Sequence, residues 1–482
     1  MNHQNQLVKN TIIIAIGKIG TQIISYLLLP LYTAKMSVSE FGTYDFICTV
    51  SVFLCPIITM LMEESMFRFL IDADTKQEKK KIITQTIFYT LIGTAIFIPL
   101  AIIILNVATN YNASLIAVFI IFVISNILIG LSNALSRGLS KIKLYSFSNF
   151  ILGISTIILT IIILFFKPSS EGLLWANAIA NLATAFVIFI KLKLGSYIGK
   201  MDKPIMKEMV KYSLPLVPNS ISWSIINMSD RIILTKMINS EANGIYAMAN
   251  KFPNIITVLY SYFCTAWKES AAKIVKEENK EKYYNNIYHD MKKFIYAVTI
   301  CLISAMPFAF PIFINKAYSD AYVYIPIIMV ATYYSNLSSF YGGIFGAYKE
   351  TKIMGTTTMV AAGINLVIDL MLVSTFKIYA ACFSTLIADV IVYLYRQHKL
   401  KKYIRLKELK WKGPTLILGI VCLAYYSKYI PNVNSIMYWT LNVISFIIAL
   451  AYSIANNYEF ILRLTRKLQS KIAHKRMKEK EV

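Results

Sequence analysis

Charged residues are scarce in this chain of 482 residues. Asp, Glu, Lys and Arg together make up 15% of the sequence, against roughly 25% in a typical soluble domain. Hydrophobic residues make up 57%, which exceeds the usual share of about 45–50%. This composition excludes a soluble enzyme, a fibrous protein and a disordered chain.

Residues that carry metal, disulfide or nucleotide chemistry are also few. The six cysteines lie in or beside apolar runs and include no CxxC pair, so no disulfide framework is predicted. The segment 17–20 (GKIG) has no strand before it and is not a phosphate loop, so direct use of ATP is not expected. No metal or other cofactor is predicted. The four histidines all fall in polar segments, which excludes a histidine relay within the membrane: His3, His289, His398 and His474.

The apolar residues gather into fourteen segments, each about as long as the 20 residues that cross a bilayer. We therefore predict an all-α polytopic membrane protein with about 14 transmembrane helices. No small-residue cleavage site follows the first segment, so it is predicted to be a retained span. The predicted spans are 11–34, 41–62, 82–106, 114–136, 145–166, 172–192, 212–237, 244–265, 294–314, 322–347, 353–375, 378–396, 413–430 and 435–457.

The distribution of basic residues gives the orientation. The formal net charge is +24, which in a soluble protein would indicate nucleic-acid binding. With the N-terminus inside, however, forty of the 49 basic residues fall in inner segments and six in outer loops. This bias predicts that both termini are cytoplasmic and that basic clusters, such as 396–412, bind anionic membrane lipids rather than nucleic acid.

The longest inner loop, about 266–293, carries apolar residues at near-helical spacing among Lys and Glu. This pattern predicts a helix that lies on the inner membrane surface.

One sequence pattern occurs twice. Residues 35–44 read KMSVSEFGTY and residues 236–246 read KMINSEANGIY, at an offset of about 201 residues. Each copy joins an odd span to an even one. Similar helix-capping turns could produce the likeness, but a weaker echo after spans 4 and 10 favours a duplication. Two six-span copies share one topology, and such parallel repeats rock about a central site.

These segments resemble the polysaccharide transporters, the O-antigen and capsular repeat-unit flippases (Wzx-type) of the multidrug/oligosaccharidyl-lipid/polysaccharide exporter superfamily. The resemblance implies two six-helix lobes, at 1–200 and 201–402, followed by two extra helices and a basic tail at 403–482. It also implies transport of an undecaprenyl-diphosphate-linked oligosaccharide for surface polysaccharides such as lipopolysaccharide or capsule, with no enzymatic activity. Polymerases and glycosyltransferases are the expected protein partners. The matching segments are 29–33, 39–44, 213–219, 229–234, 244–246, 349–352 and 363–366.

Basic residues within spans are candidates for binding the anionic diphosphate. Lys18 either extends toward the inner surface or lines the cavity. Asp230 and Arg231 are adjacent and point about 100° apart on a helix. An Asp230–Lys251 pair would either join two helices or leave Arg231 and Lys251 to bind phosphate.

Acidic residues and prolines within spans are the other candidates. Asp369 and Asp389 either carry a coupling proton or sodium ion, or bond to Asn365 and neighbouring hydroxyls. Pro30, Pro215 and Pro218 are candidate hinges, with simple helix termination as the alternative.

Two other functions use similar features. A multidrug or metabolite antiporter on the same fold would need an acidic cavity. A membrane glycan polymerase would need a large outer loop with Arg and His, and the predicted outer loops are short.

Overall fold

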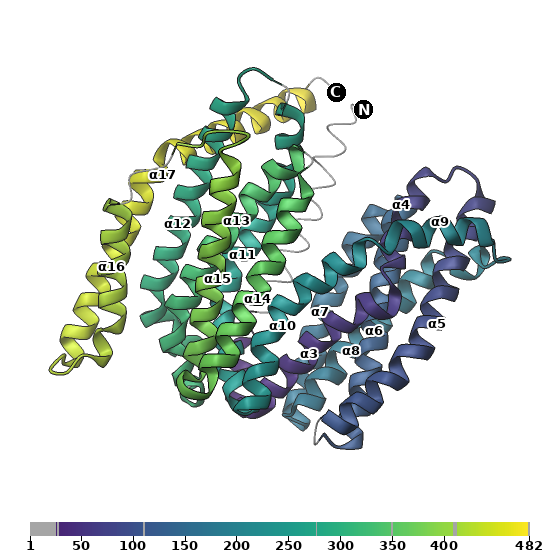
Figure 1. The fold of residues 1–482 in the computed structure, drawn as a ribbon, viewed down its shortest axis with the longest axis horizontal. Coiled ribbons are helices and arrows are strands. Elements are labelled where there is room, and N and C mark those ends of the chain that lie inside the picture. Colours follow the sequence, from purple (N-terminus) through teal and green to yellow (C-terminus); the bar gives the residue numbers. More distant parts are fainter. Residues whose placement is uncertain are drawn as a thin grey trace. The chain divides into compact units, whose positions relative to one another are not determined.

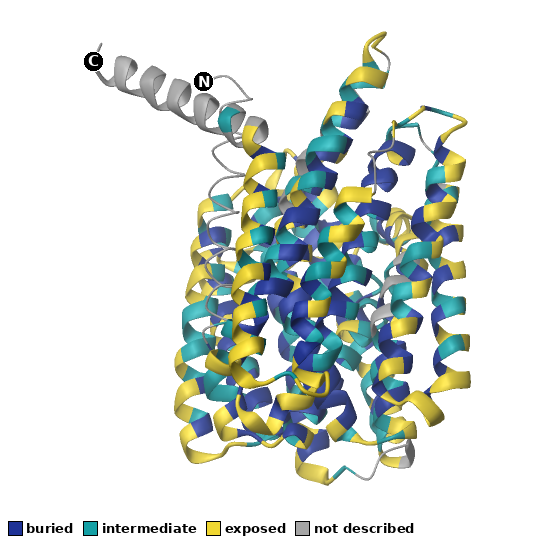
Figure 2. Ribbon diagram, turned by 90° about the vertical axis from the view of Figure 1, so that its left-hand side faces the viewer, coloured by how far each residue is buried: buried dark blue, intermediate teal, exposed yellow. Residues whose placement is uncertain are grey.

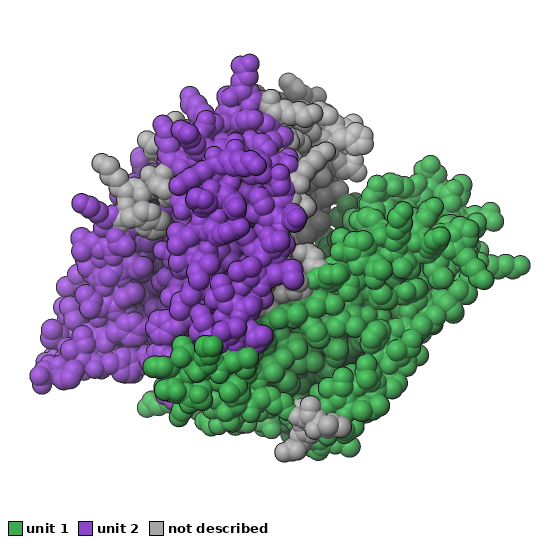
Figure 3. Space-filling model, viewed as in Figure 1, with its two compact units in different colours: residues 1–247, 314–319, 369–377 green, residues 248–313, 320–368, 378–482 purple. Residues whose placement is uncertain are grey.

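The computed structural model describes residues 26, 28–108, 111–275, 277–348, 350–407 and 412–480. Across these residues every regular element is a helix (Figure 1), which confirms the predicted all-α class. The chain divides into two compact units, coloured separately in Figure 3. Unit 1 comprises residues 1–247, 314–319 and 369–377, and unit 2 comprises 248–313, 320–368 and 378–482. The predicted lobes, 1–200 and 201–402, follow the sequence repeat, whereas the two units follow contacts between residues. The lobes therefore stay a prediction.

Nine helices in the described part of the chain are long and apolar enough to cross a membrane. Residues exposed along the outer faces of the helices (Figure 2) include many large apolar side chains, such as Leu91 and Ile436. Both features fit a protein solvated by lipid. Helices also cover most of 212–237 and all of 244–265 and 322–347, but these segments contain more polar residues and are not among the nine. The total of 14 spans stays a prediction, since most of 11–34 lies outside the described residues.

Unit 1 is centred on α6 (Ala113–Gly138), which packs against α3, α4, α7 and α8. Small and large apolar residues alternate along α6, and most of one face of this helix is buried. The Asn112 side chain caps its first turn. The other helices of this unit are α2 (Leu29–Lys35), α3 (Val38–Thr59), α4 (Met62–Asp72), α5 (Lys76–Ala108), α7 (Ile142–Phe166), α8 (Ser170–Lys191), α9 (Lys203–Ser213), α10 (Leu216–Met237), the turn η1 (Leu194–Tyr197) and the start of α11 (Ser240–Ile274).

Unit 2 is centred on α13 (Ile325–Ala347), which packs against α12 and α15. Three aromatic residues of α13, Phe340, Tyr341 and Phe345, are fully buried. The other elements are the remainder of α11, α12 (Lys280–Phe313), most of α14 (Thr351–Phe376), α15 (Ile378–Leu400), α16 (Lys412–Tyr426), η3 (Ser427–Tyr429) and α17 (Ser435–Lys480); η2 (Lys316–Tyr324) is shared between the units.

The predicted surface helix at 266–293 is wrong. Helix α11 continues to Ile274 and α12 begins at Lys280, so the segment consists of two long helix ends. The Tyr284 hydroxyl donates to the Ala271 carbonyl over 2.7 Å, and both residues are fully buried. Of the apolar residues that suggested a membrane-surface face, Ala271 and Met291 are buried inside unit 2, whereas Ile274, Val275 and Ile287 are half-buried.

The three candidate hinge prolines stand at helix starts. Pro30 occupies the first turn of α2, Pro215 is the N-cap of α10, and Pro218 lies in the first turn of α10. Proline is favoured there because the first amides of a helix lack an intrahelical acceptor. The positions match the simple helix-boundary alternative, and a hinge role stays a prediction.

Candidate functional site

The two copies of the repeated pattern meet within unit 1. A Cβ placed on Gly42 of α3 would lie 1.9 Å from the Ser240 carbonyl oxygen and 2.7 Å from the Gly244 amide nitrogen. A Cβ on Gly244 would lie 2.1 Å from the Val38 carbonyl oxygen. The Asn243 side chain donates to the Gly42 carbonyl over 2.7 Å. We call these five residues the hairpin contact. Its backbones approach so closely that both repeat glycines are required.

Capping accounts for the helix starts within the two copies, but the capping residues are not the repeated ones. The Ser37 hydroxyl accepts from the Glu40 amide at the start of α3, and the Asn239 side chain accepts from the Ala242 amide at the start of α11. Such caps satisfy otherwise unpaired amides of the first turn. The glycines, by contrast, are explained by contact between the copies and not by capping.

A cluster of charged residues lies beside the hairpin contact. Arg231 of α10 donates from Nε to Oδ2 of Asp45 on α3 over 2.6 Å, with 16% and 14% of the two side chains exposed. The guanidinium carbon lies 5.9 Å from the centre of the Tyr246 ring. Tyr246 donates its hydroxyl hydrogen bond to Asp230, which is buried. Asp230 and Arg231 thus reach different partners, as their predicted angular separation requires.

Residues 314–319 reinforce the same region. The Tyr318 hydroxyl lies 3.1 Å from the Met36 carbonyl oxygen and 3.0 Å from that of Ser37. The Asn315 amide donates to the Thr33 hydroxyl over 3.1 Å. Tyr318 is fully buried. The loop that carries the first repeat is therefore held by hydrogen bonds from a segment far away in the sequence.

Unit 2 contains a buried cation, Arg396, within the basic cluster 396–412 that is predicted to lie at the membrane surface. Arg396 of α15 is only 7% exposed. Its guanidinium donates to the hydroxyls of Thr357 and Thr358 and to the carbonyls of Ser338 and Met354, over 2.9–3.2 Å. All four acceptors are neutral. The nearest carboxylate on the same helix is that of Asp389, which attracts the Arg396 guanidinium. It lies two turns earlier in α15, about 10 Å along the helix axis.

Lys292 of α12 is a second buried cation that the sequence does not predict. It is 3% exposed and donates to the Tyr288 hydroxyl over 3.2 Å. That hydroxyl also lies 2.9 Å from the Tyr341 hydroxyl and 3.2 Å from the Tyr393 hydroxyl. The ammonium therefore ends in a buried network of tyrosine hydroxyls. The predicted inner loop ended at residue 293, so no sequence signal distinguished Lys292 from its exposed neighbours.

The other candidates are placed as follows. Lys18 lies outside the described residues. Lys251 is half-buried on α11 in unit 2, while Asp230 belongs to unit 1, and their ion pair stays a prediction. Asp369 of α14 is fully buried and Asp389 of α15 is half-buried. Asn365 donates to Ser384 and Thr385, over 3.1 and 3.3 Å.

Comparison with known proteins identifies the family. A family model described as polysaccharide biosynthesis protein matches residues 7–267, more than half of the chain. The chain belongs to this family. A curated relative, the Lsg locus putative protein 1 of Haemophilus influenzae, is 21% identical over 257 residues, which cover 52% of this chain and 62% of the relative. The match thus spans less than two thirds of that relative's length.

Solved structures show the same fold. A structure titled lipid II flippase MurJ, inward closed conformation, has a TM-score of 0.70 and 15% identity, covering 93% of this chain and all of that chain. An inward-facing multidrug resistance MATE family transporter of the MOP superfamily has a TM-score of 0.64 and 12% identity, covering 79% and 95%. The predicted resemblance to MOP-superfamily polysaccharide transporters is confirmed. The chain thus belongs to a polysaccharide biosynthesis family and shares its fold with a membrane flippase and a membrane transporter.

Proposed function

We propose that this family member moves an undecaprenyl-diphosphate-linked oligosaccharide from the inner to the outer leaflet of the bacterial cytoplasmic membrane. The family concerns polysaccharide biosynthesis, and the chain shares its fold with a protein named as a lipid flippase. Lipopolysaccharide O-antigen and capsule are the pathways that use such repeat units. The polymerase and the glycosyltransferases that handle the same glycan are the proposed protein partners.

The buried position of Arg396 is the main observation that supports an anionic substrate. Hydrogen bonds to four neutral acceptors satisfy the donors of Arg396 but do not neutralise its charge, and a substrate phosphate would supply an anion. Arg suits phosphate because its planar fork matches two oxygens. Lys292 adds a second buried positive charge in the same unit. Arg231 and Lys251 are the proposed diphosphate ligands from the sequence, together with Lys18.

The hairpin contact is the proposed outer closure of the transport path. On the predicted topology, both repeated loops lie on the outer side of the membrane. Alternating access then requires the contact to form when the path is open inward and to separate when it is open outward. The Asp45–Arg231 pair and the Tyr246–Asp230 bond stabilise the closed form. Arg231 is thus available to a phosphate only when Asp45 releases it.

Coupling to a proton or sodium gradient is proposed to use Asp369 or Asp389. A carboxyl group that is neutral in one lobe arrangement and charged in the other biases the equilibrium between them. A potential of 100 mV is worth about 2.3 kcal/mol per charge, roughly fifty-fold in an equilibrium. One coupled ion per cycle therefore suffices for directional transport.

Depletion of the protein in its own cell tests this function. The proposal predicts that surface polysaccharide falls while the lipid-linked repeat unit accumulates in the inner leaflet. Restored export from a plasmid copy, but not from an Arg231→Ala copy at equal membrane abundance, supports the proposal. Unchanged surface polysaccharide with a shift in sensitivity to cationic drugs would instead favour the multidrug antiporter.

A further inference from the structure

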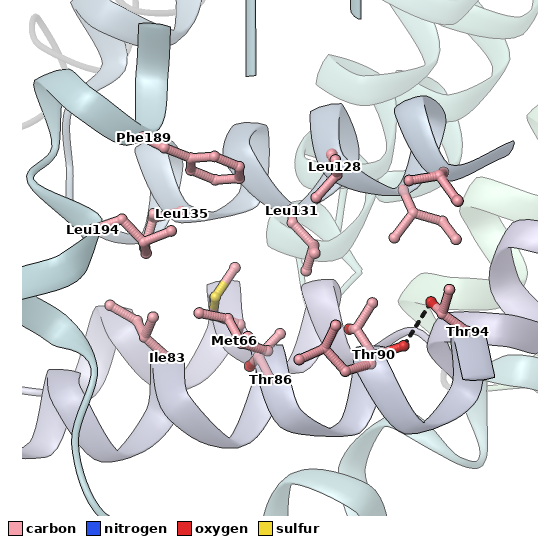
Figure 4. A pocket seen from close by; sticks show the side chains of 14 residues that line it. Met66, Ile83, Thr86, Thr90, Thr94, Leu128, Leu131, Leu135, Phe189 and Leu194 are labelled. Atoms are coloured by element: carbon pink, nitrogen blue, oxygen red, sulfur yellow. Dashed lines mark hydrogen bonds between the residues drawn. The ribbon is translucent and has the colours of Figure 1, made fainter. Parts of the chain in front are cut away.

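Unit 1 contains an apolar cavity of about 190 Å³. Figure 4 shows Ile83, Thr86 and Thr90 along α5 facing Leu128, Leu131 and Leu135 of α6. Met66 of α4 projects between them, Phe189 and Leu194 lie at one end, and Thr94 lies at the other. The cavity is thus built by α4, α5, α6, α8 and η1, all within one unit.

The walls of this cavity are hydrocarbon. The Thr86 hydroxyl donates to the Ile82 carbonyl over 3.0 Å and the Thr94 hydroxyl to the Thr90 carbonyl over 2.7 Å, so both are satisfied by their own helix. The Thr90 hydroxyl is buried and has no hydrogen-bond partner in the described part of the chain. A bound water needs two to four polar partners. The cavity therefore favours an apolar occupant.

One wall of the cavity is continuous with the lipid-facing surface. Leu91 lines the cavity, yet 62% of its surface is exposed. The neighbouring α5 residues Phe88, Ile92 and Ile96 are also exposed, and α5 is among the helices able to span a membrane. A hydrocarbon chain can therefore enter between helices directly from the bilayer.

The end of the cavity at Leu194 adjoins a basic loop. Lys191 ends α8, and Lys193 adopts a left-handed conformation with φ of 52° just before η1. Both lysines are exposed, and they form none of the ion pairs found in the described part of the chain. A positive site thus stands next to an apolar one.

Lys81 is a contrasting neighbour in this region. Its ammonium lies 2.7 Å from Asp202. The pKa of the Asp202 carboxyl is lowered by this contact and by the bond from the Ile205 amide. Lys81 is therefore already neutralised, whereas Lys191 and Lys193 can attract an external anion.

We propose that this cavity binds one acyl chain of an anionic phospholipid, whose phosphate rests on Lys191 and Lys193. Basic residues beside apolar pockets on the cytoplasmic side of membrane proteins bind anionic lipids in this way. A dry protein cavity of about 150 Å³ holds a benzene ring, so this cavity of about 190 Å³ holds a short run of methylenes. The occupant that we propose is a bilayer phospholipid, because the cavity opens at Leu91 toward the lipid-facing surface and ends beside two exposed lysines. Displacement by a prenyl phosphate is the measurement that separates this lipid from the transport substrate.

Native mass spectrometry of the full chain in detergent tests this site, with phosphatidylglycerol and phosphatidylethanolamine as probes. We expect phosphatidylglycerol to be retained more tightly. Each lysine near a lipid phosphate is worth about 1 kcal/mol, so Lys191→Gln with Lys193→Gln should weaken retention by about 30-fold. The matched control is Lys141→Gln with Lys143→Gln, which removes the same charge from another inner loop and should leave retention unchanged.

Two substitutions in the cavity separate an acyl chain from other occupants. Leu131→Trp fills the cavity and should abolish retention. Thr90→Val removes the unpaired hydroxyl without changing the shape, so it should leave retention unchanged or increase it. Loss of retention in Thr90→Val would show a hydrogen-bonding ligand instead. Equal retention by a folded Leu131→Trp protein, or displacement of phosphatidylglycerol by equimolar undecaprenyl phosphate, would overturn the proposal.

Discussion

Gly42 and Gly244 occupy equivalent positions in the two sequence repeats, and their backbones are in contact. A Cβ on Gly42 would lie 2.7 Å from the amide nitrogen of Gly244, a distance that side-chain carbons do not reach without displacement. The pattern that marks the duplication in the sequence is therefore also the pattern that brings the two copies together.

Alanine at either glycine should prevent the hairpin contact from forming. Steric overlap of this kind costs about 1–3 kcal/mol, which we expect to reduce glycan export strongly. Export and membrane abundance are measured together. Gly130→Ala in α6 is the matched control, since no atom lies within 4 Å of a Cβ there. Wild-type export by Gly42→Ala would refute a functional role for the contact.

Substitutions in the Asp45–Arg231 pair test whether Arg231 closes the transport path, binds the substrate, or does both. Asp45→Asn removes a charged hydrogen bond worth about 1.5–3 kcal/mol and should weaken closure, which is measured by disulfide trapping between cysteines placed at Val38 and Ser240. Exchange of the two residues, Asp45→Arg with Arg231→Asp, should restore trapping but not export, because the phosphate ligand has moved. Full export by the exchanged protein would mean that Arg231 only closes the path.

Arg396→Lys tests whether export depends on the positive charge of this residue or on its hydrogen bonds. A lysine ammonium cannot reach four acceptors arranged for a planar fork, so the melting temperature in detergent should fall. Residual export should nevertheless exceed that of Arg396→Met, which removes the charge as well. Equal export by the two variants, at equal abundance, would show that Arg396 is structural and that its charge is not used.

Asp369→Asn and Asp389→Asn test the coupling ion. We expect the variant of the coupling residue to transport slowly and to lose its dependence on the imposed gradient, while it still binds the lipid-linked glycan. Asp74→Asn, on an exposed loop of unit 1, is the control for loss of one carboxylate. Gradient dependence that persists in both variants would remove these residues from the coupling step.

Much of the fold could be predicted because lipid imposes a simple rule on the sequence. Each apolar run of the required length becomes a helix whose backbone groups pair internally, and the predicted helices at 114–136 and 378–396 lie within α6 and α15. Burial was harder to predict. Arg396 and Lys292 stand near the ends of apolar runs, where exposed and buried cations look alike in sequence. Their burial depends on the acceptors supplied by α13 and α14 and on the tyrosines around Lys292.

The charged cluster could be predicted only in part. Arg231 and Asp230 stood out because they interrupt an apolar run, and both lie in the cluster. Asp45 was missed although it directly follows the first repeat, because its partner is 186 residues away. The error at 266–293 has a related cause, since the same apolar spacing suits a membrane surface and a protein interior.

Transport by purified protein in vesicles tests the central claim most directly. A fluorescent undecaprenyl-diphosphate oligosaccharide is placed in both leaflets, and an impermeant reagent destroys the glycan exposed outside. With active wild-type protein and a gradient, we expect the reagent to destroy nearly all of the labelled glycan. In vesicles that contain the Gly42→Ala protein, we expect it to destroy only about one half, the share already in the outer leaflet. Accessibility that stops at one half with folded wild-type protein would contradict the account.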